Sequence, residues 1–481
     1  MAFQAVIGLE VHAQLLTRTK IFCGCSTAFG NPPNSNTCPV CLGLPGAMPV
    51  LNRSAVELAI RAGLALGCTI QPTSVFARKN YFYPDLPKGY QISQYELPIA
   101  TDGRVAYKVG DRQMVVGIHR AHLEEDAGKS LHEGFPDSGR RTYLDFNRSG
   151  VPLLEIVTRP DLSTPADAAD FFGRLRTILV AIGVNDGNME EGSLRCDANV
   201  SVRPIGSATL GTKTEIKNLN SFRFVQKALE FEIARQSGIV REGGRIHQET
   251  RLFDPVSLET RTMRSKEEAH DYRYFPEPDL PPLVVDGAWV DAVRASLPEL
   301  PDARTERFAR EYGLSDADAA FLAPDALAAR YFETLAAECG SAKVAANWMK
   351  GDLARKMKIE GHDFRTVPLS AGRLAGLIKL VAAGRISGPA AKQVLDELYA
   401  SGEDADAIVE RQGLVMVDDT AVVAGLVDEV LRRHEDAVAQ YRKGKTASLG
   451  FLVGQVVRAS GGKANPKRAT ELLRERLDAP E

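Results

Sequence analysis

The segment from Ser193 to Arg203 alternates strictly between polar and apolar side chains. Its polar positions are Ser193, Arg195, Asp197, Asn199, Ser201 and Arg203. Its apolar positions are Leu194, Cys196, Ala198, Val200 and Val202. Successive side chains of a β-strand point to opposite faces of the sheet. The pattern therefore predicts a strand with one face in the core and one face carrying a dense mixture of charges.

Two further segments show the same alternation. Near the start of the chain, the apolar positions Ile7, Leu9, Val11 and Leu15 alternate with Glu10, His12 and Gln14. Between Thr212 and Asn218, the side chains of Lys213, Glu215 and Lys217 fall on one side. A solvated face usually carries Thr, Lys, Glu and Ser singly, whereas these segments repeat Glu, His, Arg, Asp, Asn and Lys. We interpret the repeated clusters as a sheet floor that holds divalent metal and phosphate.

The first part of the chain, residues 1–294, combines such strand patterns with Gly and Pro and has few long helical stretches. Its clear helices are Ser54–Leu66, which follows Asn52, and Thr164–Ile182, which has Pro165 in its first turn. With few helices available as crossover connections, most strands should pair antiparallel. We predict an α+β domain, a largely antiparallel sheet with helices packed on one face.

The rest of the chain has helical character. Residues 295–407 are rich in Ala, Leu, Glu and Arg at helical spacing, and residues 408–481 form a smaller helical unit. The helices predicted in that unit are Val422–Tyr441, Thr446–Ala459 and Pro466–Leu477. The span Arg442–Arg468 carries seven basic residues and no acid, namely Arg442, Lys443, Lys445, Arg458, Lys463, Lys467 and Arg468. This local excess of positive charge favours contact with a phosphate backbone.

Composition narrows the class of protein. The 481 residues are 44% hydrophobic and 25% charged, and the net charge of −3 argues against coating by nucleic acid over the whole surface. No apolar run approaches the ~18 residues that a membrane span requires, so we expect no membrane association. The first ten residues lack the basic region of a signal peptide and include Glu10. Seven cysteines without an export signal are read as reduced thiols, which predicts a cytoplasmic protein.

Four of the seven cysteines form a cluster along the chain, Cys23, Cys25, Cys38 and Cys41. Four thiolates at this spacing can close a tetrahedral zinc site, with Zn–S distances near ~2.3 Å. Gly43 follows the cluster where a metal-binding turn often needs backbone freedom. Since all four ligands are thiolates and no position stays open, we predict a structural zinc rather than a catalytic one.

Longer stretches are specific enough to compare with known families. They are residues 7–12, 38–46, 79–94, 123–126, 147–155, 190–203, 212–218, 263–268, 271–279, 450–455 and 462–466. Through them, over nearly its whole length, the chain resembles the B subunits of the tRNA-dependent amidotransferases. These subunits take part in converting Glu-tRNA(Gln) to Gln-tRNA(Gln), and often Asp-tRNA(Asn) to Asn-tRNA(Asn).

The resemblance implies a fold, partners and a reaction. It implies a catalytic cradle of glutamine synthetase type over residues 1–294, a helical domain over 295–407 and a tRNA-binding tail domain over 408–481. It implies a heterotrimer with an amidase A subunit, which frees ammonia from glutamine, and a small C subunit. The substrates implied are ATP with Mg²⁺ and tRNA(Gln), tRNA(Asn) or both. The chain would phosphorylate the side-chain carboxylate of the misacylated amino acid, and ammonia would then displace phosphate.

That chemistry assigns roles to the ionic residues. Mg²⁺ prefers hard oxygen ligands, so the candidates are Glu10, Glu125 and Glu215, with His12 as a ligand or as a group that orients a carboxylate. At the end of the segment that contains His122, the family match favours Glu125 and the alternation favours Glu124. The sequence leaves that choice open.

The cationic candidates hold phosphates. Lys79 and Lys88 flank an aromatic loop at Tyr81, which would stack on the terminal adenine of tRNA. Further groups for the nucleotide are Arg195, Asp197, Arg203, Lys213 and Lys217. Glu155, together with Asp197, is a candidate for gating ammonia or for holding a second ion. Arg264 and Lys266 could close over the nucleotide.

Two other functions compete with this interpretation. One is a ligase of glutamine synthetase type that acts on a free amino acid, which would give no reason for the basic Arg442–Arg468 span. The other is a zinc-stabilised tRNA-binding scaffold without activity of its own, which would tolerate Glu10→Gln. No Walker-type or G-x-G-x-x-G motif is present, so the nucleotide is expected on a sheet face rather than in a phosphate-binding loop.

Overall fold

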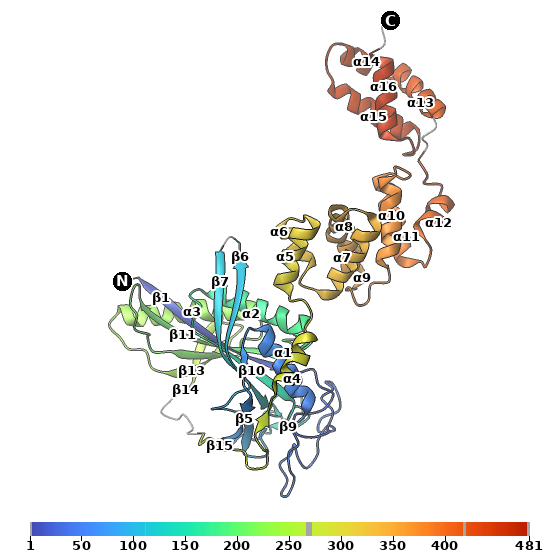
Figure 1. Cartoon of the computed structure of the whole chain (residues 1–481). Coiled ribbons are helices and arrows are strands. Elements are labelled where there is room, and N and C mark those ends of the chain that lie inside the picture. The colour runs from blue at the N-terminus through green and yellow to red at the C-terminus, as the bar shows by residue number, and fades with distance from the viewer. Residues whose placement is uncertain (1, 111, 266–271, 417–419, 479–481) are drawn as a thin grey trace. The chain divides into compact units, whose positions relative to one another are not determined.

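A computed structural model describes residues 2–110, 112–265, 272–416 and 420–478. By internal contacts the chain divides into two compact units, Met1–Pro301 and Asp302–Glu481 (Figure 1). The first unit combines strands and helices, and the second is helical in its described part. The predicted order, a sheet-containing region followed by a helical region, is confirmed.

The strands of the first unit are as follows. They are β1 Phe3–Gln14, β2 Thr69–Ile70, β3 Thr73–Ser74, β4 Phe76–Asn80, β5 Tyr90–Gln94, β6 Ala100–Val109, β7 Arg112–Glu125, β8 Lys129–Leu131, β9 Tyr143–Asp145, β10 Pro152–Thr158, β11 Leu194–Pro204, β12 Thr214–Lys217, β13 Glu249–Asp254, β14 Glu259–Ser265, β15 Phe275–Pro276 and β16 Leu283–Val284.

Within the described residues, twelve of these strands form one large sheet. The main path runs β14-β13-β12-β11-β1-β10-β7-β5-β4-β15, with β6 paired to β7 and β2 paired to β6. The sheet is mixed because β12 and β13 run parallel, while its other strand pairs are antiparallel. Strand β1 therefore lies between β11 and β10, which brings residues from three distant parts of the sequence side by side.

The helices of this unit cover one face of the sheet. They are α1 Arg53–Ala65, α2 Pro165–Ala181, α3 Phe222–Arg241 and α4 Gly287–Ala295, and α2 packs against α3 along the sheet (Figure 1). Beneath them, Ile7, Leu9 and Val11 of β1 are fully buried in one core with helix residues such as Phe171 and Phe172. Each such side chain contributes about 1.5–3 kcal/mol through burial. The apolar half of the alternation therefore fixes which face of the sheet meets the helices.

N-terminal capping residues in the sequence account for the predicted α1 and α2, whereas the residue pattern of α3 does not reveal a helix. The side chain of Asn52 caps α1 by accepting from the N–H of Ser54, and the side chain of Thr164 caps α2 by accepting from the N–H of Asp167. The predicted helices Ser54–Leu66 and Thr164–Ile182 are therefore present, each with its bounds shifted by one residue at either end. Helix α3 was not predicted. Ser221 caps it, but its buried face includes the polar residues Glu232 and Gln236, which obscure the apolar period.

The described helices of the second unit contain two hydrophobic cores. The first core involves α5 Pro301–Tyr312, α6 Asp316–Leu322, α7 Ala326–Cys339, α8 Ala342–Trp348, a π-helical turn Met349–Leu353, α9 Ala354–Glu360, α10 Ala371–Ala382, α11 Gly388–Ala400 and α12 Ala405–Arg411. The second involves α13 Thr420–Arg433, α14 Glu435–Arg442, α15 Ala447–Ala459 and α16 Pro466–Leu477. The predicted helix Val422–Tyr441 is interrupted at His434, where α13 ends before α14 begins. The three-domain division at 294/295 and 407/408 stays a prediction.

Within the described part of the chain, no helix combines the length and apolar character that crossing a bilayer requires.

Candidate active site

The polar face of the large sheet gathers ionic side chains from five strands. The pairing register sets His12 of β1 opposite Arg195 of β11 on one side and opposite Glu155 of β10 on the other. Glu155 in turn lies opposite His122 of β7, and Glu124 lies two residues further along β7, opposite Leu153. Since paired residues point to the same face of a sheet, these side chains converge above β1, β10 and β7.

Three of these residues form a group with the composition of a metal site. The Nε2 atom of His12 lies 3.4 Å from Oε2 of Glu155 and 4.0 Å from Oε1 of Glu124. One ligand atom from each of the three residues lies within 4.8 Å of the others. Nε2 of His122 lies 3.3 Å from Oε2 of Glu155, so the carboxylate of Glu155 is shared between two imidazoles. Two carboxylates and an imidazole can ligate one divalent cation.

Buried carboxylates and buried imidazoles lie side by side in this group, and each shifts the pKa of the other. Burial alone would lower the pKa of His12, but the carboxylates of Glu155 and Glu124 raise it above its ordinary value. The same opposition raises the pKa of His122 to about 9. Against the cost of burial, His122 and His12 hold the pKa of Glu155 well below its usual range. The two imidazoles therefore supply the positive charge that these buried carboxylates need.

Glu10 and Glu215 continue the ionic array toward β12. The Asn199 amide donates to Oε1 of Glu10 at 2.8 Å. Burial, followed by the charges of Glu155 and Glu215, raises the pKa of Glu10. Nζ of Lys217 lies 2.9 Å from Oε1 of Glu215 and donates to Oδ2 of Asp197 at 2.6 Å. Carboxylates and cations thus alternate across β1, β11 and β12.

A cavity of about 460 Å³ opens above part of this array, and Glu10 and Glu215 do not belong to its lining. Its ionic lining consists of His12, Lys79, Glu124, Asp126, Arg148, Glu155, Arg195, Asp197 and Lys217. Among the described residues, the Lys79 ammonium has no hydrogen-bond partner, although it lies 5.0 Å from the ring of Tyr272 and 5.9 Å from that of Tyr81. Burial would lower the pKa of Lys79, and the carboxylates of Glu124 and Glu155 raise it instead. The ammonium of Lys79 is thus available to an anionic ligand in the cavity.

In the lining of the cavity, the buried carboxylate of Asp126 pairs with both Arg195 and Arg148. Oδ2 of Asp126 accepts hydrogen bonds from Arg195 at 2.8 Å and from Gln14 at 2.9 Å, and Oδ1 lies 3.7 Å from Nε of Arg148. Burial would raise the pKa of Asp126, but Arg195 and Arg148 lower it below its ordinary value. Two guanidinium groups share this single carboxylate, so this part of the cavity carries excess positive charge.

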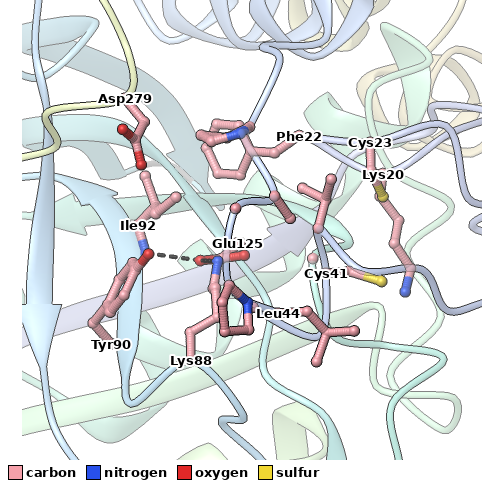
Figure 2. A pocket seen from close by; sticks show the side chains of 17 residues that line it. Lys20, Phe22, Cys23, Cys41, Leu44, Lys88, Tyr90, Ile92, Glu125 and Asp279 are labelled. Atoms are coloured by element: carbon pink, nitrogen blue, oxygen red, sulfur yellow. Dashed lines mark hydrogen bonds and ion pairs between the residues drawn. The ribbon is translucent and has the colours of Figure 1, made fainter.

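The predicted grouping of Glu125 with Glu10 and His12 needs a correction. Because successive residues of β7 alternate, Glu124 faces the polar array and Glu125 faces the opposite side. Glu125 pairs with Lys88 and accepts a hydrogen bond from the Ile92 N–H at 2.8 Å. Both residues line a second cavity of about 220 Å³, shown in Figure 2. Glu124, which the alternation argument favoured, lies on the polar face with His12 and Glu155, and which of the two glutamates binds metal stays a prediction.

Other predicted residues lie outside the 460 Å³ cavity. Arg203 is opposite Gln4, eight positions along β11 from Arg195, which corresponds to roughly 26 Å of strand. Lys213 is exposed just before β12 and does not line the cavity. Of the cationic residues predicted to hold phosphates, Lys79, Arg195 and Lys217 line this cavity. Lys266 lies outside the described residues, and the side chain of Arg264 is likewise not described.

Sequence reasoning missed several lining residues, above all His122, Asp126 and Arg148. His122 lies opposite Glu155, and this position makes it part of the ionic group. The alternation of His122 with Glu124 was the signal that could have included it. Arg148 follows β9 in a loop, where no strand period applies, so only the folded chain brings it to Asp126.

The four cysteines converge in a loop of the same unit. One sulfur from each of Cys23, Cys25, Cys38 and Cys41 lies within 4.8 Å of the others. The N–H of Cys38 donates to the Cys41 sulfur at 3.2 Å. A hydrogen bond from the Cys23 thiol is the main cause that lowers the pKa of Cys41 to about 4, and it raises the pKa of Cys23 in return. The predicted clustering of these thiols is what the structure shows.

Comparison with known families defines the class of protein. The family model described as the GatB/GatE catalytic domain matches residues 5–291, which contain the large sheet and its ionic array. The model described as the GatB domain matches residues 330–477. The chain is thus built from the two domains of one family of amidotransferase subunits.

Individual relatives agree with this class over their full length. The B subunit of the aspartyl/glutamyl-tRNA(Asn/Gln) amidotransferase of Geobacter sulfurreducens is 56% identical over 477 residues, which cover 99% of this chain and 100% of that protein. Its counterpart in Anaeromyxobacter dehalogenans strain 2CP-1 is 55% identical over 479 residues, 99% of each chain. The counterpart in Moorella thermoacetica is 53% identical over 477 residues, 99% of this chain and 100% of its own. The chain belongs to the family of aspartyl/glutamyl-tRNA(Asn/Gln) amidotransferase B subunits, and the resemblance is confirmed.

Proposed function

We propose that this chain catalyses the ATP-dependent step in which Glu-tRNA(Gln), Asp-tRNA(Asn) or both are amidated to Gln-tRNA(Gln) and Asn-tRNA(Asn). The observation that supports this most directly is the 460 Å³ cavity, which combines the His12–Glu124–Glu155 group with the ammonium of Lys79. A metal-type group and unpaired positive charge in one cavity suit a nucleotide triphosphate that lies beside an anionic acceptor.

The reaction has two balanced steps. A carboxylate oxygen of the amino acid takes the γ-phosphoryl group of ATP, and ADP leaves. The nitrogen of ammonia then bonds to the carbonyl carbon, phosphate leaves with its oxygen, and a proton is released. Transfer of a phosphoryl group needs alignment and neutralisation of charge more than covalent help. The cavity offers both, since its lining is ionic and its positive groups come from separate strands.

The donor set of the His12 group fits a divalent cation. Glu124 and Glu155 offer hard carboxylate oxygens, which Mg²⁺ prefers, and His12 either completes the set or orients a carboxylate. Glu10 and Glu215 lie further along the same face, near enough for their charges to affect each other. When bound, Mg²⁺ would neutralise phosphate charge. Lys79, Arg195 and Lys217 are the side chains that we assign to the phosphates, with Asp197 positioning Lys217.

The four-cysteine loop fits zinc. Its sulfurs are close enough for one tetrahedral ion, and no ligand other than thiolate belongs to the group. Gly43, two residues after the last cysteine, adopts a left-handed backbone conformation with φ of 67°, as a tight metal-binding turn requires. We therefore propose a structural zinc, which stabilises the loop and takes no part in the reaction.

Partners and domains follow from the family. We propose a heterotrimer with an amidase A subunit as the ammonia source and a small C subunit. We further propose that residues 1–294 are a catalytic cradle of glutamine synthetase type, that 295–407 are a helical domain and that 408–481 bind tRNA. The basic span Arg442–Arg468, which includes all of α15 and the start of α16, supports the last assignment.

The deciding experiment bypasses the amidase. The purified heterotrimer receives ATP, Mg²⁺, Glu-tRNA(Gln) and ammonium instead of glutamine, and both ADP and Gln-tRNA are measured. Glu10→Gln should lower both products by orders of magnitude, because Glu10 belongs to the ionic array, whereas Glu96→Gln at an exposed position should not. Unchanged amidation by Glu10→Gln would support the scaffold alternative. ADP formed equally well with free glutamate would support the amino-acid ligase.

The tail assignment has its own test. A heterotrimer without residues 408–481 should bind tRNA more weakly, with a flatter dependence on salt, because each lost phosphate contact removes about one counterion from the slope. Its ATP affinity should stay unchanged. A salt slope equal to that of the full chain would show that the tail does not contact the tRNA backbone.

A further inference from the structure

Lys20 is a fully buried lysine beside the cysteine loop. Its relative exposure is 0%, although its side chain ends in an amino group. Its Nζ atom donates to the carbonyl oxygens of Asn36 at 2.7 Å and Phe146 at 3.2 Å. The two carbonyls satisfy hydrogen bonds but bring no negative charge. A buried ammonium without a counter-charge is strongly unfavourable, so the surroundings of Lys20 must supply one.

The nearby carboxylates are engaged with other cations. Among the described residues, no aspartate or glutamate forms an ion pair with Lys20. The cavity that Lys20 lines also contains Glu125 and Asp279. Glu125 pairs with Lys88, and Asp279 lies 3.3 Å from Nη2 of Arg78. The remaining acidic groups at this place are the thiols.

The side chain of Lys20 runs against the cysteine cluster. A Cβ atom built on Gly150 would lie 3.4 Å from Cβ of Cys41, 3.5 Å from Cδ of Lys20 and 3.9 Å from Oε2 of Glu125, so all three side chains flank the same glycine, and Glu125 is the one of them that is paired with Lys88. Figure 2 shows Lys20, Cys23 and Cys41 together at one side of the smaller cavity. The main-chain N–H of Lys20 also donates to the carbonyl of Cys25 at 3.0 Å. Lys20 is therefore packed against the loop that contains the four cysteines.

We propose that Lys20 is the counter-charge of the four-cysteine metal site. This inference depends on the zinc site proposed above. Four thiolates around a divalent ion carry a net charge of −2, and the ammonium of Lys20 brings the buried unit to −1. In return, the thiolates provide negative charge to an ammonium that forms no ion pair with a carboxylate of the described residues. Lys20 is thus a positioning residue for the metal site: its charge stabilises the metal-bound thiolates.

The hydrogen bonds of Lys20 connect the same unit to the chain that enters β10. Asn36 belongs to the loop between Cys25 and Cys38, and Phe146 lies between β9 and β10. The two segments also meet through the Asn36 N–H, which donates to Oδ1 of Asn147 at 2.8 Å, and the Phe146 N–H, which donates to Oδ1 of Asn34 at 2.8 Å. A test must therefore separate the charge of Lys20 from its role as a hydrogen-bond donor.

Two variants of the full chain in its heterotrimer make that separation. Lys20→Gln removes the charge and keeps an NH₂ donor, and Lys20→Met removes both. Lys129→Met is the matched control, because Lys129 lies 4.9 Å from the ring of Phe29 in the same loop and does not line the cavity that Lys20 shares with Cys23 and Cys41. Zinc affinity is measured by competition with a chromogenic chelator. Substitution with Co²⁺ gives a thiolate-to-metal charge-transfer band, whose energy reports the charge near the sulfurs.

We expect Lys20→Gln and Lys20→Met to weaken zinc binding about tenfold or more, as loss of a residue that supports metal ligands typically does. We also expect their charge-transfer bands to move to lower energy, while Lys129→Met matches the wild type. If Lys20→Gln bound zinc within twofold of the wild-type affinity and its Co²⁺ charge-transfer band did not move, the proposal that Lys20 is the counter-charge would be wrong. Should the wild-type chain bind neither Zn²⁺ nor Co²⁺ at the cysteines, the zinc site would fall together with this inference.

Discussion

Two groups of ligand-type side chains lie in the same unit, and they are built in opposite ways. The cysteine group takes its members from one loop between Cys23 and Cys41. The His12–Glu124–Glu155 group takes one residue from each of three strands that are far apart in the sequence. Spacing along the chain is enough to bring the first group together. The second exists only because the register of β1, β10 and β7 places its members opposite one another.

The surroundings of the two groups differ as much as their assembly. The thiols are packed beside a buried lysine and keep no open coordination position. The carboxylates and imidazole line a cavity of about 460 Å³ that has room for a ligand. A closed group of soft ligands suits a structural metal, and an open group of hard ligands suits a metal that meets a substrate. The comparison thus assigns the cysteine group to the stability of the fold and the His12–Glu124–Glu155 group to the reaction.

The largest expected effect falls on the strand-built group. Glu124→Gln removes a carboxylate of the proposed metal group while keeping its shape, so ATP-dependent amidation should fall about 10³-fold, equivalent to ~4 kcal/mol of transition-state stabilisation. The Mg²⁺ concentration for half-maximal rate should rise as well. Steady-state assays with varied Mg²⁺ measure both. If Glu125→Gln raised the Mg²⁺ requirement and Glu124→Gln left it unchanged, the register argument would be wrong.

A second effect concerns the stability of the strand-built region. Asp126→Asn leaves Arg195 and Arg148 without their shared carboxylate, and breaking such a buried pair costs about 3–5 kcal/mol. The pKa of Asp126 is lowered in the folded state, so its contribution is present above the unfolded value near 3.8 and is lost as pH falls through the folded value. Urea unfolding should show a constant difference between wild type and variant from about pH 8 to 5, which shrinks below about pH 4. A difference that shrinks between pH 8 and 5 would contradict this assignment.

Substitutions in the cysteine group should change the stability of the protein more than its reaction rate. Cys38→Ser removes one of the four thiolates, so bound zinc should fall toward zero and unfolding should become easier by about 2–3 kcal/mol. The rate per correctly folded molecule should change little. Metal analysis and thermal unfolding measure the first two quantities. Cys339→Ser, at a half-buried cysteine of the helical unit, serves as the control and should leave the zinc content unchanged.

The smallest expected effect sharpens the role of the loop backbone. Gly43 has φ of 67°, and a Cβ atom there would lie 2.3 Å from Cγ of Lys88. Gly43→Ala should therefore cost about 1–2 kcal/mol through backbone strain and crowding. Gly24, between two of the cysteines, has no atom within 4 Å of such a Cβ, so Gly24→Ala is the matched control. Equal unfolding midpoints for the two variants would show that the turn at Gly43 is not constrained.

The sequence predicted much of this arrangement and missed particular parts for physical reasons. The alternation in β1 and β11 correctly assigned Glu10, His12, Arg195 and Asp197 to one face, because a period of two is a local property. The same reasoning, followed strictly, would have chosen Glu124. Arg148 lies in a loop, where no period exists, and helix α3 carries buried polar residues that weaken its pattern. Those two features were therefore not predicted.

By itself, the sequence determined the faces of the strands, the cysteine cluster, the helical second half and the family. Each of these depends on residues that are close along the chain or on motifs that stay intact within it. Only the tertiary structure decided which strands are neighbours and in what register. Because a shift of one residue turns every side chain of a strand to the other face, that register alone separates Glu124 in the ionic cavity from Glu125 beside Lys88.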